Sequence, residues 1–64
     1  MTVRDFCSLC VDDSITVALW DVDAEVEVFR GSMRNAMLGS FADYDVDSID
    51  PPFDTGFCLN IIVD

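Results

Sequence analysis

The sequence predicts a single α+β domain spanning residues 1–64, in which two short helices cover a four-stranded antiparallel sheet. The chain has 64 residues, which is enough for one domain and close to the lower limit for an independent core. Hydrophobic residues make up 52% of it, too large a share for a disordered acidic chain. Segments with helical spacing and segments with strand-like alternation follow one another in the order α-β-β-α-β-β.

The first helix is expected over residues 2 to 10, TVRDFCSLC. Thr2 is a suitable N-cap, and Asp5, three positions later, completes a capping box near the positive end of the helix dipole. The apolar residues then recur with the i, i+3, i+4, i+7 spacing of a helix that faces a core. These residues are Val3, Phe6, Cys7 and Cys10.

The second helix is expected in the segment MRNAML, residues 33 to 38. Ser32 precedes it as a plausible N-cap, and Gly39 follows it as a plausible stop. Met33, Ala36 and Met37 would form its apolar side. Methionines at this spacing fill gaps in a core more often than they form a binding site.

Four segments have the composition or alternation of strands: ITVALW (15 to 20), EVEVFR (25 to 30), residues 43 to 49, and FCLNIIV (57 to 63). The first two flank a turn at residues 21 to 24 and should form a hairpin, in which Val26 and Val28 share one face. Pro and Gly residues mark a turn before the fourth strand. The inward positions predict a core of Phe6, Val17, Leu19, Val28, Leu59 and Ile61.

The charge balance limits the kind of partner. The chain has thirteen acidic residues, three arginines, no lysine and no histidine, and its net charge is −10. Such a field repels nucleic acids and anionic membranes and attracts basic proteins. Direct nucleic-acid binding is therefore not expected, because phosphate contacts need Lys and Arg. Solubility alone is the other explanation of this acidity.

Acidic residues recur at every second position in two segments. In the stretch ADYDVDSID, residues 42 to 50, an extended strand would place three of them on one face about 6.6 Å apart. One strand of duplex DNA carries a phosphate about every 3.4 Å of helix axis, so two neighbouring rows would restore that density. The strand order that would make them neighbours is left open. The predicted partner-binding residues are Asp21, Asp23, Glu25, Glu27, Asp43, Asp45 and Asp47.

Trp20 and Phe53 lie near these acids in the sequence and are candidate aromatic anchors. Only Trp20 is included among the predicted partner-binding residues. Packing in the core or in a turn is the alternative role for either ring. Anchors of this kind often carry much of the binding energy of an interface.

No metal site, cofactor or catalytic residue is predicted. A D-x-D-x-D run from Asp43 resembles the start of a calcium loop, with Asp54 at its twelfth position, but Ser48 replaces the glycine that the turn needs. Cys7 and Cys10 form a C-x-x-C without enough further ligands for zinc. The odd number of cysteines and the lack of a secretory signal lead us to expect reduced thiols in a bacterial cytoplasm.

Several stretches resemble a known class of proteins: TVRDFCSLCVDDSITVALWDVD, VFRGS and YDVDSID…LNIIV. The chain resembles small acidic proteins encoded by phages and prophages of gut Firmicutes, and in character it is most similar to anti-CRISPR proteins. The resemblance implies an inhibitor of a host defence nuclease that binds where DNA should go, an acidic DNA mimic.

Two alternatives stay open. The first is an oligomeric DNA-nicking or metal-dependent anti-defence protein, in which Asp12, Asp13 and Asp54 would hold magnesium across an interface. The second is a non-enzymatic phage accessory module that binds other proteins. Whichever function applies, we expect a homodimer, because a short chain with this apolar content cannot cover all of its hydrophobic surface alone.

Overall fold

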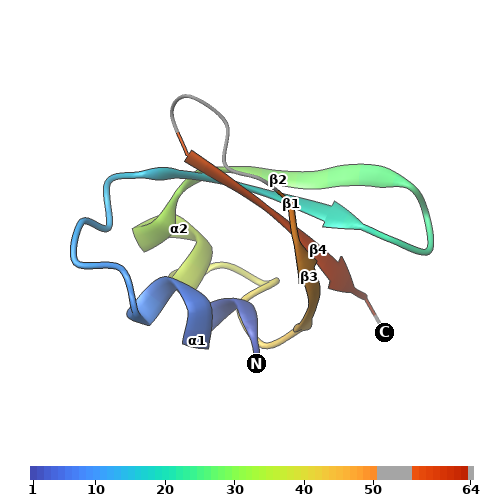
Figure 1. Ribbon diagram of the computed structural model, residues 1–64, viewed down its shortest axis with the longest axis horizontal. Helices are drawn as coiled ribbons and strands as arrows, with labels where there is room; N and C mark the ends of the chain where they lie inside the picture. The colour runs from blue at the N-terminus through green and yellow to red at the C-terminus, as the bar shows by residue number, and fades with distance from the viewer. Residues whose placement is uncertain (51–55, 64) are drawn as a thin grey trace.

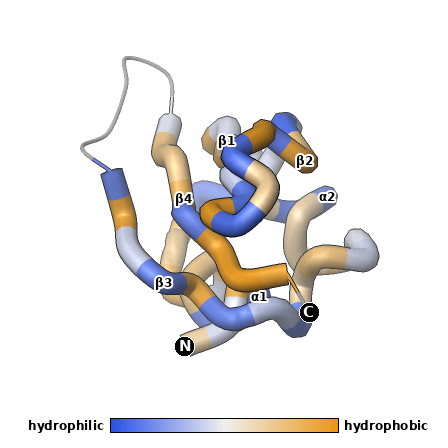
Figure 2. Tube along the Cα trace, turned by 90° about the vertical axis from the view of Figure 1, so that its right-hand side faces the viewer, coloured by the Kyte–Doolittle hydropathy of each residue, from blue (hydrophilic) through white to orange (hydrophobic). Residues whose placement is uncertain are grey.

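The computed structural model describes residues 1–50 and 56–63 and confirms the order of elements predicted from the sequence. Both helices lie on the same side of a four-stranded sheet (Figures 1 and 2). The elements are α1 (Val3–Ser8), β1 (Thr16–Asp21), β2 (Val26–Ser32), α2 (Met33–Leu38), β3 (Asp45–Ile49) and β4 (Gly56–Ile62).

The sheet is mixed, which corrects the expectation of a fully antiparallel sheet. Its strand order is β2-β1-β4-β3. β1 and β2 form the predicted antiparallel hairpin, and β3 and β4 are also antiparallel, but β4 runs parallel to β1 from Thr16↔Gly56 to Asp21↔Ile61. The chain crosses by way of α2 from the β2 edge of the sheet to the opposite edge. β4 therefore enters beside β1 in the same direction.

Both helices begin at the residues that the sequence indicates. The Thr2 hydroxyl accepts a hydrogen bond from the Asp5 N–H, while the Asp5 carboxylate accepts one from the Thr2 N–H. The hydrogen bond from the Thr2 N–H to the carboxylate lowers the pKa of Asp5. Ser32 accepts from the N–H of Asn35 at 3.1 Å, as an N-cap should. α1 ends at Ser8, two residues earlier than expected.

The core lies between the helices and the inner face of the sheet. Val17, Leu19, Leu59 and Ile61 are fully buried there, as predicted. Phe6 and Val28 are only partly buried and pack against the edge of this cluster. The helices contribute Val3, Cys7, Met33 and Ala36 to the core.

A β-bulge in β2 changes the predicted alternation of the hairpin. Leu19 pairs with Phe29, but Trp20 pairs with Glu27, so Val28 is the extra residue on β2. A bulge adds one residue to one strand and shifts the side-chain pattern beyond it. Val26, opposite Asp21 at the end of the hairpin, is 47% exposed, whereas Val28 packs against the core cluster.

Candidate functional site

The first acidic group, the hairpin acids, comprises Asp21, Asp23, Glu25 and Glu27. Asp21 ends β1, and its carboxylate accepts hydrogen bonds from the N–H groups of Asp23 (3.0 Å) and Ala24 (3.3 Å). Its backbone carbonyl accepts from the N–H of Glu25 at 2.8 Å. Asp21 therefore shapes the turn, which leaves Asp23, Glu25 and Glu27 exposed.

Glu25 has a left-handed backbone, with φ of 55°. This conformation favours Gly or Asn over a residue with a longer side chain. The chain thus keeps an acid at the tip of the turn where glycine would be less strained. Its position corrects the prediction that Glu25 begins a strand.

The second acidic group, the β3 acids, comprises Asp43, Asp45 and Asp47. The predicted strand 43 to 49 begins only at Asp45, so Asp43 precedes it. The pairing with β4 shifts between Val46 and Ser48, which makes Asp47 the bulged residue. All three side chains are exposed. The prediction that the three acids alternate regularly along one strand is therefore wrong, although they remain clustered in one short segment.

The strand register brings the two acidic groups to the same end of the sheet. Asp21 lies opposite Val26 on one side and opposite Ile61 on the other. Ile61 in turn lies opposite Val46, between Asp45 and Asp47. The groups do not form adjacent rows, because β2 and β3 are the two outer strands. The two edges are three strand spacings apart, about 14 Å, and Asp21 on β1 is two spacings from β3, about 10 Å. The major groove of B-DNA is about 12 Å wide.

All three arginines form ion pairs with acids on the surface. Arg4 pairs with Asp43, Arg30 with Glu27 at 2.7 Å, and Arg34 with Asp13 at 3.0 Å. Among the described residues, five acids of the two groups have no ion-pair partner: Asp21, Asp23, Glu25, Asp45 and Asp47. Their charge is available to an external partner.

Trp20 lies on the sheet face that the helices do not cover, here called the outer face. Val17 and Leu19 point into the core, so the alternating residues Ala18 and Trp20 point away from it. Trp20 is 37% exposed, which argues against the alternative that it packs in the core. Cys58, Asn60 and Ile62 on β4 share this face by the same alternation.

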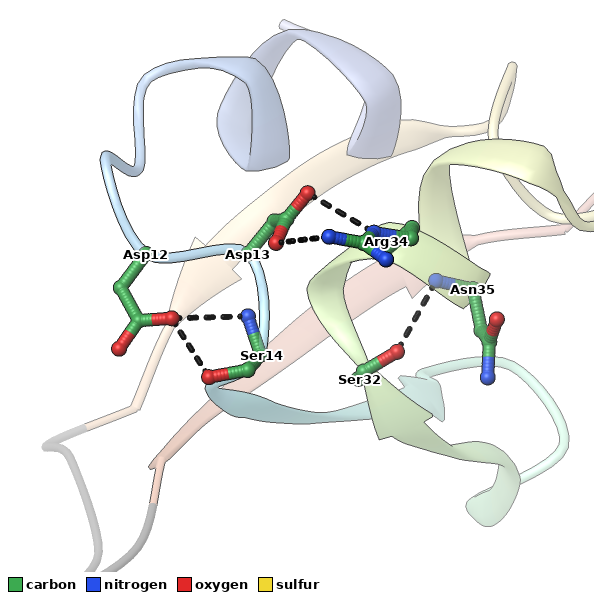
Figure 3. Close-up of polar contacts among 6 residues, drawn as sticks. All are labelled: Asp12, Asp13, Ser14, Ser32, Arg34 and Asn35. Carbon is green, nitrogen blue, oxygen red and sulfur yellow. Dashed lines mark hydrogen bonds and ion pairs between the residues drawn. The ribbon is translucent and has the colours of Figure 1, made fainter.

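A shallow pocket lies at the other end of β1, beside the beginning of α2. Its volume is about 320 Å³, and Asp13, Ser14, Ser32, Arg34 and Asn35 line it. Figure 3 shows both oxygens of the Asp13 carboxylate facing the Arg34 guanidinium, which donates from Nε and from a terminal nitrogen, both at 3.0 Å. This pairing raises the pKa of Arg34.

Asp12 is also satisfied within the chain. One of its carboxylate oxygens accepts hydrogen bonds from the hydroxyl and the N–H of Ser14, which lower the pKa of Asp12 (Figure 3). The Arg34 charge beside Asp13 opposes binding of a magnesium ion there. Residues 1–50 and 56–63 contain no cluster of three or more His, Cys, Asp or Glu side chains suited to hold a metal. Phe53 and Asp54, at the twelfth position of the calcium-like loop, lie outside these residues.

The cysteines have the features of apolar packing groups. Cys7 is fully buried in the core, and burial raises the pKa of its thiol to about 11. Burial also raises the pKa of Cys58, assisted by the nearby carboxylate of Asp50. A thiol that stays protonated is a poor nucleophile and a poor metal ligand.

Comparison with protein-family models, curated proteins and solved structures found no match to this chain. None of the helices in the described part of the chain is long and apolar enough to cross a membrane. The two acidic groups and the outer face between them are the surface features that stand out by charge and by exposed aromatic area.

Proposed function

We propose that this chain is a non-catalytic inhibitor that binds the basic, nucleic-acid-binding surface of another protein in place of a nucleic-acid backbone. One observation carries the proposal. Two acidic groups from distant parts of the sequence lie at the same end of the sheet, about 10–14 Å apart across its strands. The separation is close to that of two phosphate rows flanking a DNA groove.

The electrostatics support the same function. The net charge is −10, and among the residues that the structure describes eight acids remain without an ion-pair partner after the three arginines are paired. Exposed like charges repel each other and contribute nothing to the core, so their concentration at one end favours a role outside folding. A basic groove would be attracted to that end and oriented by it before contact.

The specific form that we propose is a phage-encoded, anti-CRISPR-like inhibitor of a defence nuclease in the bacterial cytoplasm. This form rests on the resemblance of the sequence to small acidic phage proteins and on the compatibility of the acidic surface with a DNA channel. A CRISPR nuclease holds nucleic acid in a positively charged channel. An acidic protein seated there would compete with DNA.

The test measures displacement of labelled target DNA from purified, guide-loaded CRISPR nucleases by the parent chain and by three double variants. The first variant carries Asp45→Asn and Asp47→Asn, and the second carries Asp23→Asn and Glu25→Gln. The control carries Asp12→Asn and Asp13→Asn, at the opposite end of β1. Each variant changes the net charge by the same two units.

We expect the first two variants to compete less well, while the control stays close to the parent. Two exposed charge contacts contribute about 0.4–2 kcal/mol, or about two- to thirty-fold in affinity. Binding should also weaken steeply with salt, because the Debye length falls from about 10 Å at 0.1 M to about 3 Å at 1 M. Equal competition by all variants would show that the acids only solubilise the protein.

A further inference from the structure

We propose that the outer face of the sheet binds an arginine side chain of the basic partner, stacked on Trp20 between the two acidic groups. This inference rests on the proposed function and specifies the chemistry of the contact. It concerns Trp20 on the outer face, whose role is separate from that of the acids. The acids would attract any basic protein, whereas Trp20 would select among them.

The outer face has two exposed apolar side chains near its centre, with polar side chains among and around them. Trp20 and Ile62 are 37% and 40% exposed on the two central strands, whereas Ala18 on the same face is only 2% exposed. Asn60 lies opposite Trp20 and Arg30 opposite Ala18, which adds polar groups to this face. Glu27 and Asp45 border this centre on the outer strands, opposite Trp20 and Ile62 respectively. An apolar centre with a polar rim is the usual anatomy of a protein interface.

The position of Trp20 couples its ring to the acidic groups. In the sheet register it lies between Glu27 on β2 and Asn60 on β4. Asp21 follows it directly and begins the turn that carries Asp23 and Glu25. A cation drawn to the acids therefore reaches the indole at the same end of the sheet, where the ring quadrupole attracts it further.

Charge decides between a basic partner and a second copy of the chain. Two copies meeting through this face would bring together two chains of net charge −10, with Asp45 on both rims. Glu27 on each rim is already paired with Arg30. A basic partner instead neutralises those rims. Arginine fits better than lysine, because a planar guanidinium stacks on an indole and is less strongly hydrated than an ammonium.

Trp20 is the single tryptophan of the chain, so its fluorescence reports on this face alone. The experiment titrates the parent chain with two probes of equal charge and length, a nona-arginine and a nona-lysine peptide. Fluorescein-labelled versions of the peptides measure affinity by anisotropy. The matched variants are Trp20→Leu on the outer face and Leu38→Ala, which removes an 81% exposed side chain from α2 on the other side of the sheet.

We expect nona-arginine to change the Trp20 emission and to bind about two- to five-fold more tightly than nona-lysine, the size of an exposed cation–π contact. Trp20→Leu should abolish the preference for nona-arginine without weakening the binding of nona-lysine. Leu38→Ala should leave the preference unchanged. If Trp20→Leu fails to fold, the emission change and the arginine preference of the parent still decide the question.

The outcomes separate this inference from the proposed function. Equal binding of both peptides with unchanged Trp20 emission would overturn the inference and leave the acidic function standing. Binding of neither peptide would overturn both. Sedimentation of the parent as a dimer that Trp20→Leu converts to a monomer would assign the outer face to a second copy and overturn the inference.

Discussion

Replacing Gly56 by alanine should strongly destabilise the protein, because the backbone of β1 leaves no room for a Cβ atom at this residue of β4. A Cβ built on Gly56 overlaps the carbonyl oxygen of Thr16 and lies 2.7 Å from its carbonyl carbon, whereas ordinary contact begins at 3.4 Å. The obstacle is backbone, which cannot rotate away as a side chain can. The two strands must therefore separate at the end where their parallel pairing begins.

The expected cost has two parts. Overpacking in a well-packed region costs about 1–3 kcal/mol, and one or two lost strand hydrogen bonds add about 1 kcal/mol each. The total of about 2–5 kcal/mol is a large share of the roughly 3–10 kcal/mol expected for a domain of this size. Urea denaturation followed by circular dichroism measures the difference directly.

Gly31→Ala is the matched control. Its Cβ would meet the Phe29 ring at 3.1 Å, and this ring is a side chain that can shift. We expect it to cost less than about 1 kcal/mol, within the range of mild core adjustments. If Gly56→Ala unfolds at the same urea concentration as the parent, Gly56 does not face Thr16 and the parallel pairing is wrong.

The remaining predictions concern stability, ionisation and assembly. Leu59→Ala should lower the free energy of unfolding by about 2–5 kcal/mol, because Leu59 is fully buried; an unchanged denaturant midpoint would contradict its place in β4. Glu25→Gly should raise the free energy of unfolding by about 0.5–1 kcal/mol by relieving the left-handed backbone, and a loss of stability would refute that strain. Stability should fall as pH rises from 9 to 11, because the unfolded Cys7 thiol ionises near its ordinary pKa of 9.0 and the folded one only near 11; Cys7→Ala should flatten this slope, and an identical slope in both proteins would count against it. We also predict self-association from the apolar content of so short a chain, which sedimentation would disprove by finding only the 7.1 kDa monomer at micromolar concentration.

The features that could be predicted from the sequence depend on neighbouring residues. The capping box of α1, the N-cap Ser32 and the β1–β2 hairpin are each contained in a few consecutive positions. The alternation in β4 was also enough to place Leu59 and Ile61 in the core. In these cases side-chain chemistry and local geometry indicate the same structure.

The features that could not be predicted depend on residues far apart in the sequence. The alternation of a strand identifies its buried face but not its neighbour, so the parallel pairing of β1 with β4 has no local signal. The bulge at Val28 and that at Asp47 likewise arise from pairing with another strand. For this reason the sequence identifies two groups of acids, whereas their position at the same end of the sheet follows only from the strand register.

The central place of β4 has a consequence for how the protein is made. β4 follows β1, β2 and β3 in chain order, yet it lies between β1 and β3 and contributes Leu59 and Ile61 to the core. Before β4 is synthesised, a nascent chain on the ribosome contains the hairpin, the two short helices and β3. It lacks the strand that pairs with both β1 and β3. Isolated hairpins and helices this short are marginal in water. Folding must then wait until synthesis has passed Ile62, and a chain released earlier would expose its apolar residues to the proteases of the cell.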